Sequence, residues 1–118
     1  DFGPVLDASG VRSFFGEGYP YQRIFRPFGL DFTGSTFVAK TMTIESRMGN
    51  MRGLRADGTL PWRAFRQRCI VVKPLKGVVL NAVDLSNPGA WVLFSRKSWQ
   101  KRTQPFFLSF MSVKETMC

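Results

Sequence analysis

Three near-continuous apolar runs limit what this chain can fold into more than any other feature of its sequence. They occupy residues 3–10 (GPVLDASG), 35–45 (STFVAKTMTIE) and 103–113 (TQPFFLSFMSV). The second run is the most strand-like, because it combines β-branched and aromatic residues. Strands that are apolar on both faces are typical of parallel sheets covered by helices. The runs therefore predict buried parallel strands in an α/β fold.

The segments between the runs indicate helices and a hairpin. Residues 11–29 contain a weakly helical stretch that ends at Pro27 and Gly29. Residues 68–75 and 77–83 are two short apolar runs on either side of a Lys-Gly pair, which predicts a hairpin outside the main sheet.

A second helix is predicted over residues 87–100. Asn87 is a favourable N-cap for it, and Pro88 is a favourable first residue. Four large apolar residues at loose helical intervals are predicted to belong to the core: Trp91, Leu93, Phe94 and Trp99.

Residues 46–68 form an arginine-rich segment without steady periodicity, which predicts a long irregular loop that is either functional or poorly ordered. The net charge of the chain is +9, and residues 47–76 hold eight basic residues against Asp57 alone, or +7 of that charge. The basic residues are Arg47, Arg52, Arg55, Arg63, Arg66, Arg68, Lys73 and Lys76. Such a segment can bind a nucleic acid or another anionic partner, or it can be a solvated loop.

Other classes of protein are disfavoured by composition. At 118 residues the chain is long enough for one domain with a core. It has no histidine and only two cysteines, outside any CxxC pattern, so no metal site is expected. No apolar run approaches a membrane span, and no secretory signal is visible. Reduced thiols in a cytoplasmic protein are the simplest interpretation.

Residues capable of chemistry lie where the predicted strands end. These are Ala8-Ser9-Gly10, Lys40-Thr41, and Ser109 with Ser112. In a parallel α/β barrel, ligands gather at the carboxyl ends of the strands. A buried lysine there is costly unless it faces an anion or an electron-rich partner. The alternative for Lys40 is a partly exposed residue on an edge strand.

Four blocks, PVLDASG, TFVAKTMTIESRMGN, GVVLNAVDLSNPG and PFFLSFMSV, together resemble the first part of the dihydroorotate dehydrogenase family. Members of that family are FMN-dependent oxidoreductases of pyrimidine biosynthesis, folded as TIM (βα)8 barrels. The resemblance spans nearly all of the chain. A complete barrel needs about 250 residues. The resemblance thus implies a single incomplete barrel-like domain over residues 1–118, about the N-terminal half of a barrel with a small hairpin excursion.

The resemblance also implies roles for individual residues. Ala8, Ser9 and Gly10 would pass close to the flavin, and Thr41 would lie beside it. Lys40 would contact both the flavin and the orotate ring, and its charge would stabilise the anionic reduced flavin.

The pyrimidine substrate would meet a second group of residues. Asn81 matches the family's asparagine that binds dihydroorotate or orotate, since an amide offers both a donor and an acceptor. Val83, Asp84 and Leu85 would form the backbone around it. The alternative for Asn81 is a plain strand-to-helix turn with Asn87 as the cap.

The sequence departs from the family in three respects. Asp84 stands where the family often has glycine, and a carboxylate there would repel an anionic substrate unless it points away. The stretch Glu45-Ser46-Arg47-Met48-Gly49-Asn50 lacks the proline of the family's Glu-Pro-Arg-x-Gly-Asn. The family's catalytic base, a cysteine or serine on a later loop, and its flavin-phosphate loops are expected beyond Cys118. No catalytic residue is therefore assigned in this chain, and neither Cys69 nor Cys118 matches that position.

Whether the chain is itself an enzyme is left open. We expect the isolated chain to be an inactive fragment of a dihydroorotate-oxidising flavoprotein. A non-enzymatic basic module that docks an anionic partner is the alternative. A serine hydrolase using Ser9 or Ser13 is a third hypothesis, although without histidine only a lysine or carboxylate could serve as base. Open strand edges predict a homo-oligomer, most simply a dimer.

Overall fold

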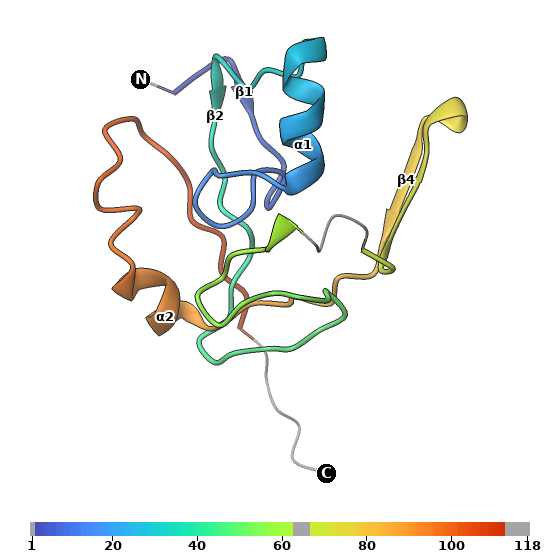
Figure 1. Cartoon of the computed structure of the whole chain (residues 1–118). Coiled ribbons are helices and arrows are strands. Elements are labelled where there is room, and N and C mark those ends of the chain that lie inside the picture. Colours follow the sequence, from blue (N-terminus) through green and yellow to red (C-terminus); the bar gives the residue numbers. More distant parts are fainter. Residues whose placement is uncertain (1, 63–66, 113–118) are drawn as a thin grey trace.

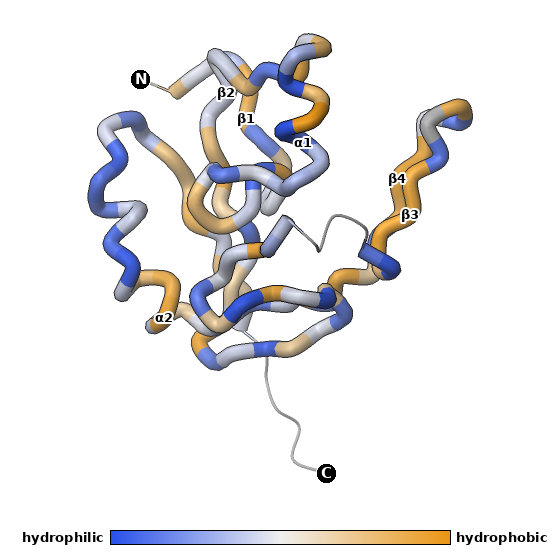
Figure 2. The backbone as a smooth tube through the Cα atoms, in the orientation of Figure 1, coloured by the Kyte–Doolittle hydropathy of each residue, from blue (hydrophilic) through white to orange (hydrophobic). Residues whose placement is uncertain are grey.

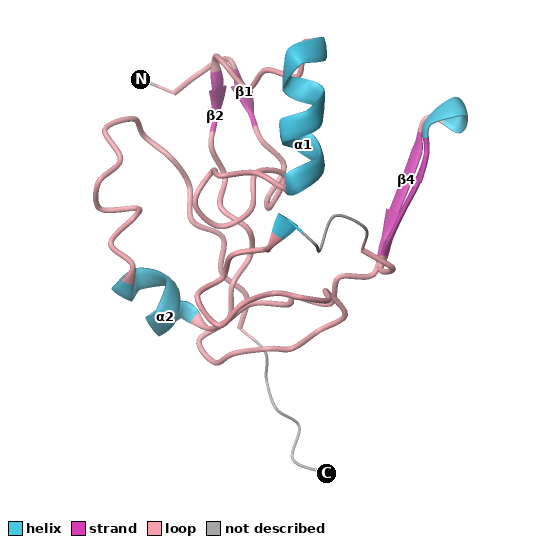
Figure 3. Ribbon diagram, viewed as in Figure 1, coloured by secondary structure: helices cyan, strands magenta, loops and turns pink. Residues whose placement is uncertain are grey.

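The computed structural model describes residues 2–62 and 67–112. Short elements alternate with long irregular connections (Figure 1, Figure 3). In chain order they are β1 (Val5–Leu6), α1 (Pro20–Phe25), the 3-10 helix η1 (Arg26–Phe28), β2 (Ser35–Thr36), β3 (Ile70–Lys73), the 3-10 helix η3 (Pro74–Lys76), β4 (Val78–Asn81) and α2 (Ala90–Ser95).

The three apolar runs lie side by side in parallel. β1 pairs with β2, and two isolated parallel bridges, Val38–Phe107 and Met42–Phe110, join the continuation of β2 to the last run. The Met42 amide donates to the Ser109 carbonyl at 3.0 Å. The predicted parallel direction is therefore confirmed for these segments. That they open a (βα)8 barrel stays a prediction.

The prediction that all three runs are buried is wrong for the first run and holds only in part for the last, whose Phe106 and Leu108 pack half-buried against the core. Val5 and Leu6 of β1 are exposed, and so are Phe107 and Phe110. The middle run alone contributes fully buried apolar side chains, namely Phe37, Ala39 and Met42. The physical reason is packing, because the buried side chains of the middle run share one core cluster with Phe14, Leu93 and Trp99, and the exposed side chains of the outer runs do not belong to it.

The first predicted helix is confirmed, whereas the second starts later and ends earlier than predicted, at Ala90 and Ser95. Helix α1 continues into η1, and Gly29 ends it in the left-handed region at φ 99°. The N-cap of α2 is Gly89, not Asn87, and its first residue is Ala90, not Pro88. Gly89 has φ 93°, so helical backbone geometry cannot begin before Ala90.

The core gathers where α2 and the following turn meet the middle run. Leu93 and Trp99 are buried there, and the Trp99 indole donates to the Phe14 carbonyl at 2.7 Å. Phe94 packs edge-on against Trp99, with ring centroids 5.0 Å apart. The prediction for Trp91 is wrong, because its side chain is 80% exposed. Side chains two positions apart in a helix point to nearly opposite sides, so Trp91 cannot share the face of Leu93.

Strands β3 and β4 form the predicted antiparallel hairpin, which projects from the rest of the chain (Figure 1). Figure 2 shows that both strands are apolar. The exposed aliphatic residues of the hairpin, including Leu75 of the connecting η3, are Val71, Val72, Leu75, Val78, Val79 and Leu80. Between residues 46 and 62 the chain has neither an α-helix nor a strand, as predicted, while Arg63 and Arg66 lie outside the described residues. None of the helices in the described part is long and apolar enough to cross a bilayer.

We propose that these exposed apolar surfaces pair in a homo-oligomer, most simply a two-fold dimer. Val72 lies opposite Val79 in the hairpin, so the pair presents one apolar patch. Light scattering at micromolar concentration should give about twice the 13.4 kDa mass of one chain. A stable monomer at that concentration would contradict the proposal.

Candidate functional site

One cavity of about 620 Å³ is lined by every residue to which the sequence assigned a cofactor or substrate contact. These are Ala8, Ser9, Gly10, Lys40, Thr41, Asn81, Val83, Asp84 and Leu85. They come from three separate parts of the chain: the end of the first run, the middle run, and the segment after β4. The structure thus brings together residues that lie up to 77 positions apart, from Ala8 to Leu85.

A row of three hydroxyl groups crosses the parallel segments beside this cavity. The Ser9 hydroxyl donates to the Ala39 carbonyl at 2.9 Å and lies 2.9 Å from the Thr41 hydroxyl. The Thr41 hydroxyl lies 2.8 Å from that of Ser109. Ser9 follows the end of β1, as predicted, whereas Thr41 and Ser109 lie just before the last parallel bridge, Met42–Phe110, and not at the carboxyl ends of their runs. Ser112 lies apart from it and lines a different cavity.

Lys40 is buried, with only 8% of its surface exposed, so the alternative of an exposed edge lysine is wrong. Its ammonium group donates to the Ser86 carbonyl at 2.6 Å and lies 5.1 Å from the centroid of the Phe14 ring. No ion pair involves Lys40 among the described residues. Burial lowers the pKa of Lys40 from 10.5 to about 8. The electrostatic effect of Cys69 acts in the opposite direction and raises the pKa.

The buried Asn87 amide shapes the loop that carries the substrate-side residues. Its Oδ1 accepts from the amides of Thr43 (3.3 Å) and Gly89 (2.9 Å). Its Nδ2 donates to the Thr43 hydroxyl (2.9 Å) and the Leu85 carbonyl (2.7 Å). Sequence reasoning assigned Asn87 to a helix cap and missed this role. The Asn-Pro-Gly stretch was a signal for a turn of this kind.

Two consecutive residues of the same loop, Asp84 and Leu85, have left-handed backbone at φ 54° and 51°. Ser86 supports them, since its hydroxyl donates to the Val83 carbonyl at 2.8 Å and accepts from the Met51 amide at 3.0 Å. The conformation costs energy for residues other than glycine, and it persists only where the surroundings hold it.

The Asp84 carboxylate is 59% exposed and lies 3.4 Å from the Arg47 guanidinium. It therefore has a cationic neighbour, although an exposed pair of this kind contributes little stability. Asn81 ends β4, is exposed, and lies at the same cavity.

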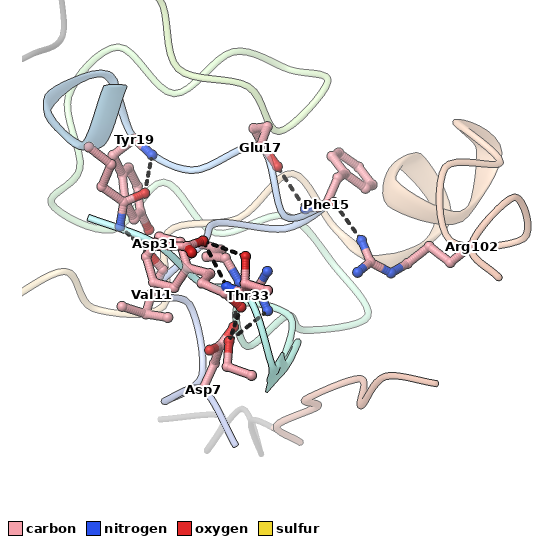
Figure 4. Close-up of polar contacts among 12 residues, drawn as sticks. Asp7, Val11, Phe15, Glu17, Tyr19, Asp31, Thr33 and Arg102 are labelled. Atoms are coloured by element: carbon pink, nitrogen blue, oxygen red, sulfur yellow. Dashed lines mark hydrogen bonds and ion pairs between the residues drawn. The ribbon is translucent and has the colours of Figure 1, made fainter. Parts of the chain in front are cut away.

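Tyr19 and Val11 form a further part of the cavity wall. The Gln22 side chain links them, because its Oε1 accepts from the Tyr19 amide at 2.8 Å and its Nε2 donates to the Val11 carbonyl at 2.6 Å (Figure 4). Burial raises the pKa of the Tyr19 phenol, so this wall stays uncharged. Sequence reasoning did not single out these residues.

The serine-nucleophile hypothesis gains no support from this geometry. The Ser9 hydroxyl donates to a carbonyl and contacts another hydroxyl, and neither is a base. Ser13 is only 3% exposed and out of reach of a solvent-borne substrate.

A larger cavity, of about 870 Å³, lies along the arginine-rich loop and contains none of the predicted site residues. We assign the candidate site to the smaller cavity, because the buried lysine and the hydroxyl row lie there. No cluster of three or more metal-ligating side chains occurs within the described ranges.

Comparison of the chain with protein-family models, with curated proteins and with solved structures finds no match.

The lowered pKa of Lys40 predicts how stability depends on pH. The unfolded chain keeps the lysine proton up to about pH 10.5, whereas the folded chain loses it near pH 8, so the free energy of unfolding should rise between these values. Urea unfolding of the wild type should show a gain of up to about 3 kcal/mol over this range relative to Lys40→Met. Parallel pH profiles for the two proteins would show that Lys40 is not the buried cation described here.

Proposed function

We propose that the chain is part of a dihydroorotate dehydrogenase-like, FMN-dependent oxidoreductase, and that the 620 Å³ cavity holds the flavin and pyrimidine rings. The observation that carries this proposal is the convergence of all nine implied contact residues on that cavity. In the reaction, dihydroorotate gives one proton to a base and a hydride to the flavin, and orotate results. The residues of this chain would bind and orient the rings, and no catalytic base is assigned among them.

The first wall of the cavity fits a flat cofactor. Gly10 has φ 83°, and a Cβ there would approach the Lys40 Cγ to 3.2 Å. A side chain at this position would therefore strain the backbone and press on the lysine. The small residues of the wall leave backbone open to a ring, and the Thr41 hydroxyl offers a hydrogen bond to its polar edge. When bound, the flavin would supply the hydride acceptor.

The electrostatics of the cavity favour an anion. The Lys40 ammonium is buried and has a neutral carbonyl as its hydrogen-bond acceptor. Burial of a cation without a charged partner costs free energy, which a nearby anion would offset. The carboxylate of orotate or the anionic reduced flavin would supply that charge. This interaction would strengthen as negative charge develops on the flavin during reduction. An interaction that is stronger in the transition state than in the ground state accelerates the reaction.

Asp84 has the opposite effect on the same cavity. Its carboxylate lowers the positive potential, but the Arg47 guanidinium at 3.4 Å offsets part of its charge. Removal of the carboxylate would both relieve repulsion and leave Arg47 free to face the ligand.

The Lys40→Ala variant should bind FMN at least about tenfold more weakly than the wild type, a change of about 1.4 kcal/mol. Quenching of flavin fluorescence measures the affinity directly. Lys101→Ala is the matched control, because it removes the same charge from an exposed residue outside the cavity. An FMN dissociation constant equal in all three proteins would sink the assignment of Lys40.

The Asp84→Gly variant should bind orotate more tightly, by about 1 kcal/mol at a solvent-screened site. Glycine also suits the left-handed backbone at this position. Asp84→Asn separates the two effects, because asparagine removes the charge and still tolerates that backbone. Calorimetry should show a similar gain for both variants. A gain for glycine alone would assign the effect to the backbone, and a loss for both would give Asp84 a structural role.

A further inference from the structure

We propose that the arginine-lined cavity along residues 46–56 binds a small phosphate-bearing anion with two or more phosphate groups. The proposal concerns a cavity separate from the flavin site and does not depend on the proposed function.

Four arginines line this cavity of about 870 Å³: Arg47, Arg52, Arg55 and Arg68. Among its lining residues there is no acidic side chain. Like charges gathered around one concave surface repel each other, and a bound anion relieves that repulsion. Guanidinium groups suit phosphate in particular, because their fork of donors matches its oxygens.

Arg47 retains unused hydrogen-bonding capacity at this cavity. Its Nε is buried and has no hydrogen-bond partner within the described residues. Its only ion pair there is the 3.4 Å contact with the exposed Asp84 carboxylate. Buried polar atoms are normally satisfied, so Arg47, a residue that lines the cavity, has donor capacity that the described residues do not use.

The backbone of the loop is fixed while its charged side chains stay exposed. The Gln67 side chain accepts from the Arg52 amide at 2.9 Å and donates to the Arg52 carbonyl at 2.8 Å. The Arg55 amide donates to the Thr59 carbonyl at 2.9 Å. A held backbone lowers the entropic cost of binding, and the side chains of Arg52, Arg55 and Arg68 remain available to turn toward a ligand.

The shape and lining favour a small polyphosphate over a single-stranded nucleic acid. No aromatic residue lines the cavity, so bases would find no stacking surface. The volume falls in the range of small-molecule sites. A pyrophosphate group, free or in a nucleoside diphosphate, fits this chemistry.

Calorimetric titration of the full chain with pyrophosphate at low salt tests the proposal. We expect saturable binding of one pyrophosphate per chain. The variant R52Q/R55Q should bind at least about tenfold more weakly, since it removes two of the four lining charges. K73Q/K76Q is the matched control, because it removes the same charge from the hairpin and should change the affinity less than about twofold. Circular dichroism of each variant checks its fold, and R68Q, expected to weaken binding about threefold, replaces the double variant if that one does not fold.

Three results would overturn the proposal. The first is pyrophosphate binding that does not saturate, and the second is an equal loss of affinity in the arginine and lysine variants. The third comes from a labelled single-stranded RNA. If that RNA binds and saturating pyrophosphate fails to displace it, the basic residues act as an extended nucleic-acid surface. Displacement of the RNA by pyrophosphate, combined with the loss in R52Q/R55Q, would support the cavity.

Discussion

The buried Asn87 amide is the interaction on which the candidate site depends. Its side chain makes hydrogen bonds to Thr43, Leu85 and Gly89, and only 1% of the residue is exposed. These bonds tie the end of the middle run to the loop after β4. Loss of one partner would leave buried polar groups unsatisfied, at about 1–3 kcal/mol each. The amide therefore fixes the loop against the run that carries Lys40, and the Ser86 carbonyl reaches the lysine as a consequence.

Lys40 combines a stability cost with a capacity to bind. Burial lowers its pKa to about 8, so near neutral pH the folded chain holds a charge that water would solvate better. A residue of this kind weakens the free chain and favours a complex with an anion. Similar trade-offs are common where a site is preorganised for charge. Arg47 connects the two cavities. It lines the arginine cavity, and its ion-pair partner Asp84 lines the Lys40 cavity.

Local pattern predicted part of this arrangement. The apolar runs indicated parallel neighbours, and the Lys-Gly pair indicated the hairpin, because both depend on short-range composition. Burial was overestimated for β1, because the exposure of a side chain depends on what packs against that face of the strand and not on the composition of the strand. The role of Asn87 was not predicted for a similar reason. An asparagine that suits a helix cap can also form hydrogen bonds with a distant residue, here Thr43, 44 positions away. The spacing of the site residues along the chain does not predict that they line one cavity. Only the family resemblance grouped them as contacts of the same ligands.

We propose that Lys40 is a buried cation and that an anionic ring ligand binds beside it. Nuclear magnetic resonance of lysine ε-carbons, assigned with Lys40→Met, measures its titration directly. In the free chain we expect a Lys40 pKa of about 8. Saturation with FMN and orotate should raise that value, because an anion beside the ammonium favours its charged form. A free-chain pKa near the ordinary 10.5, or a value that the two ligands leave unchanged, would contradict the account.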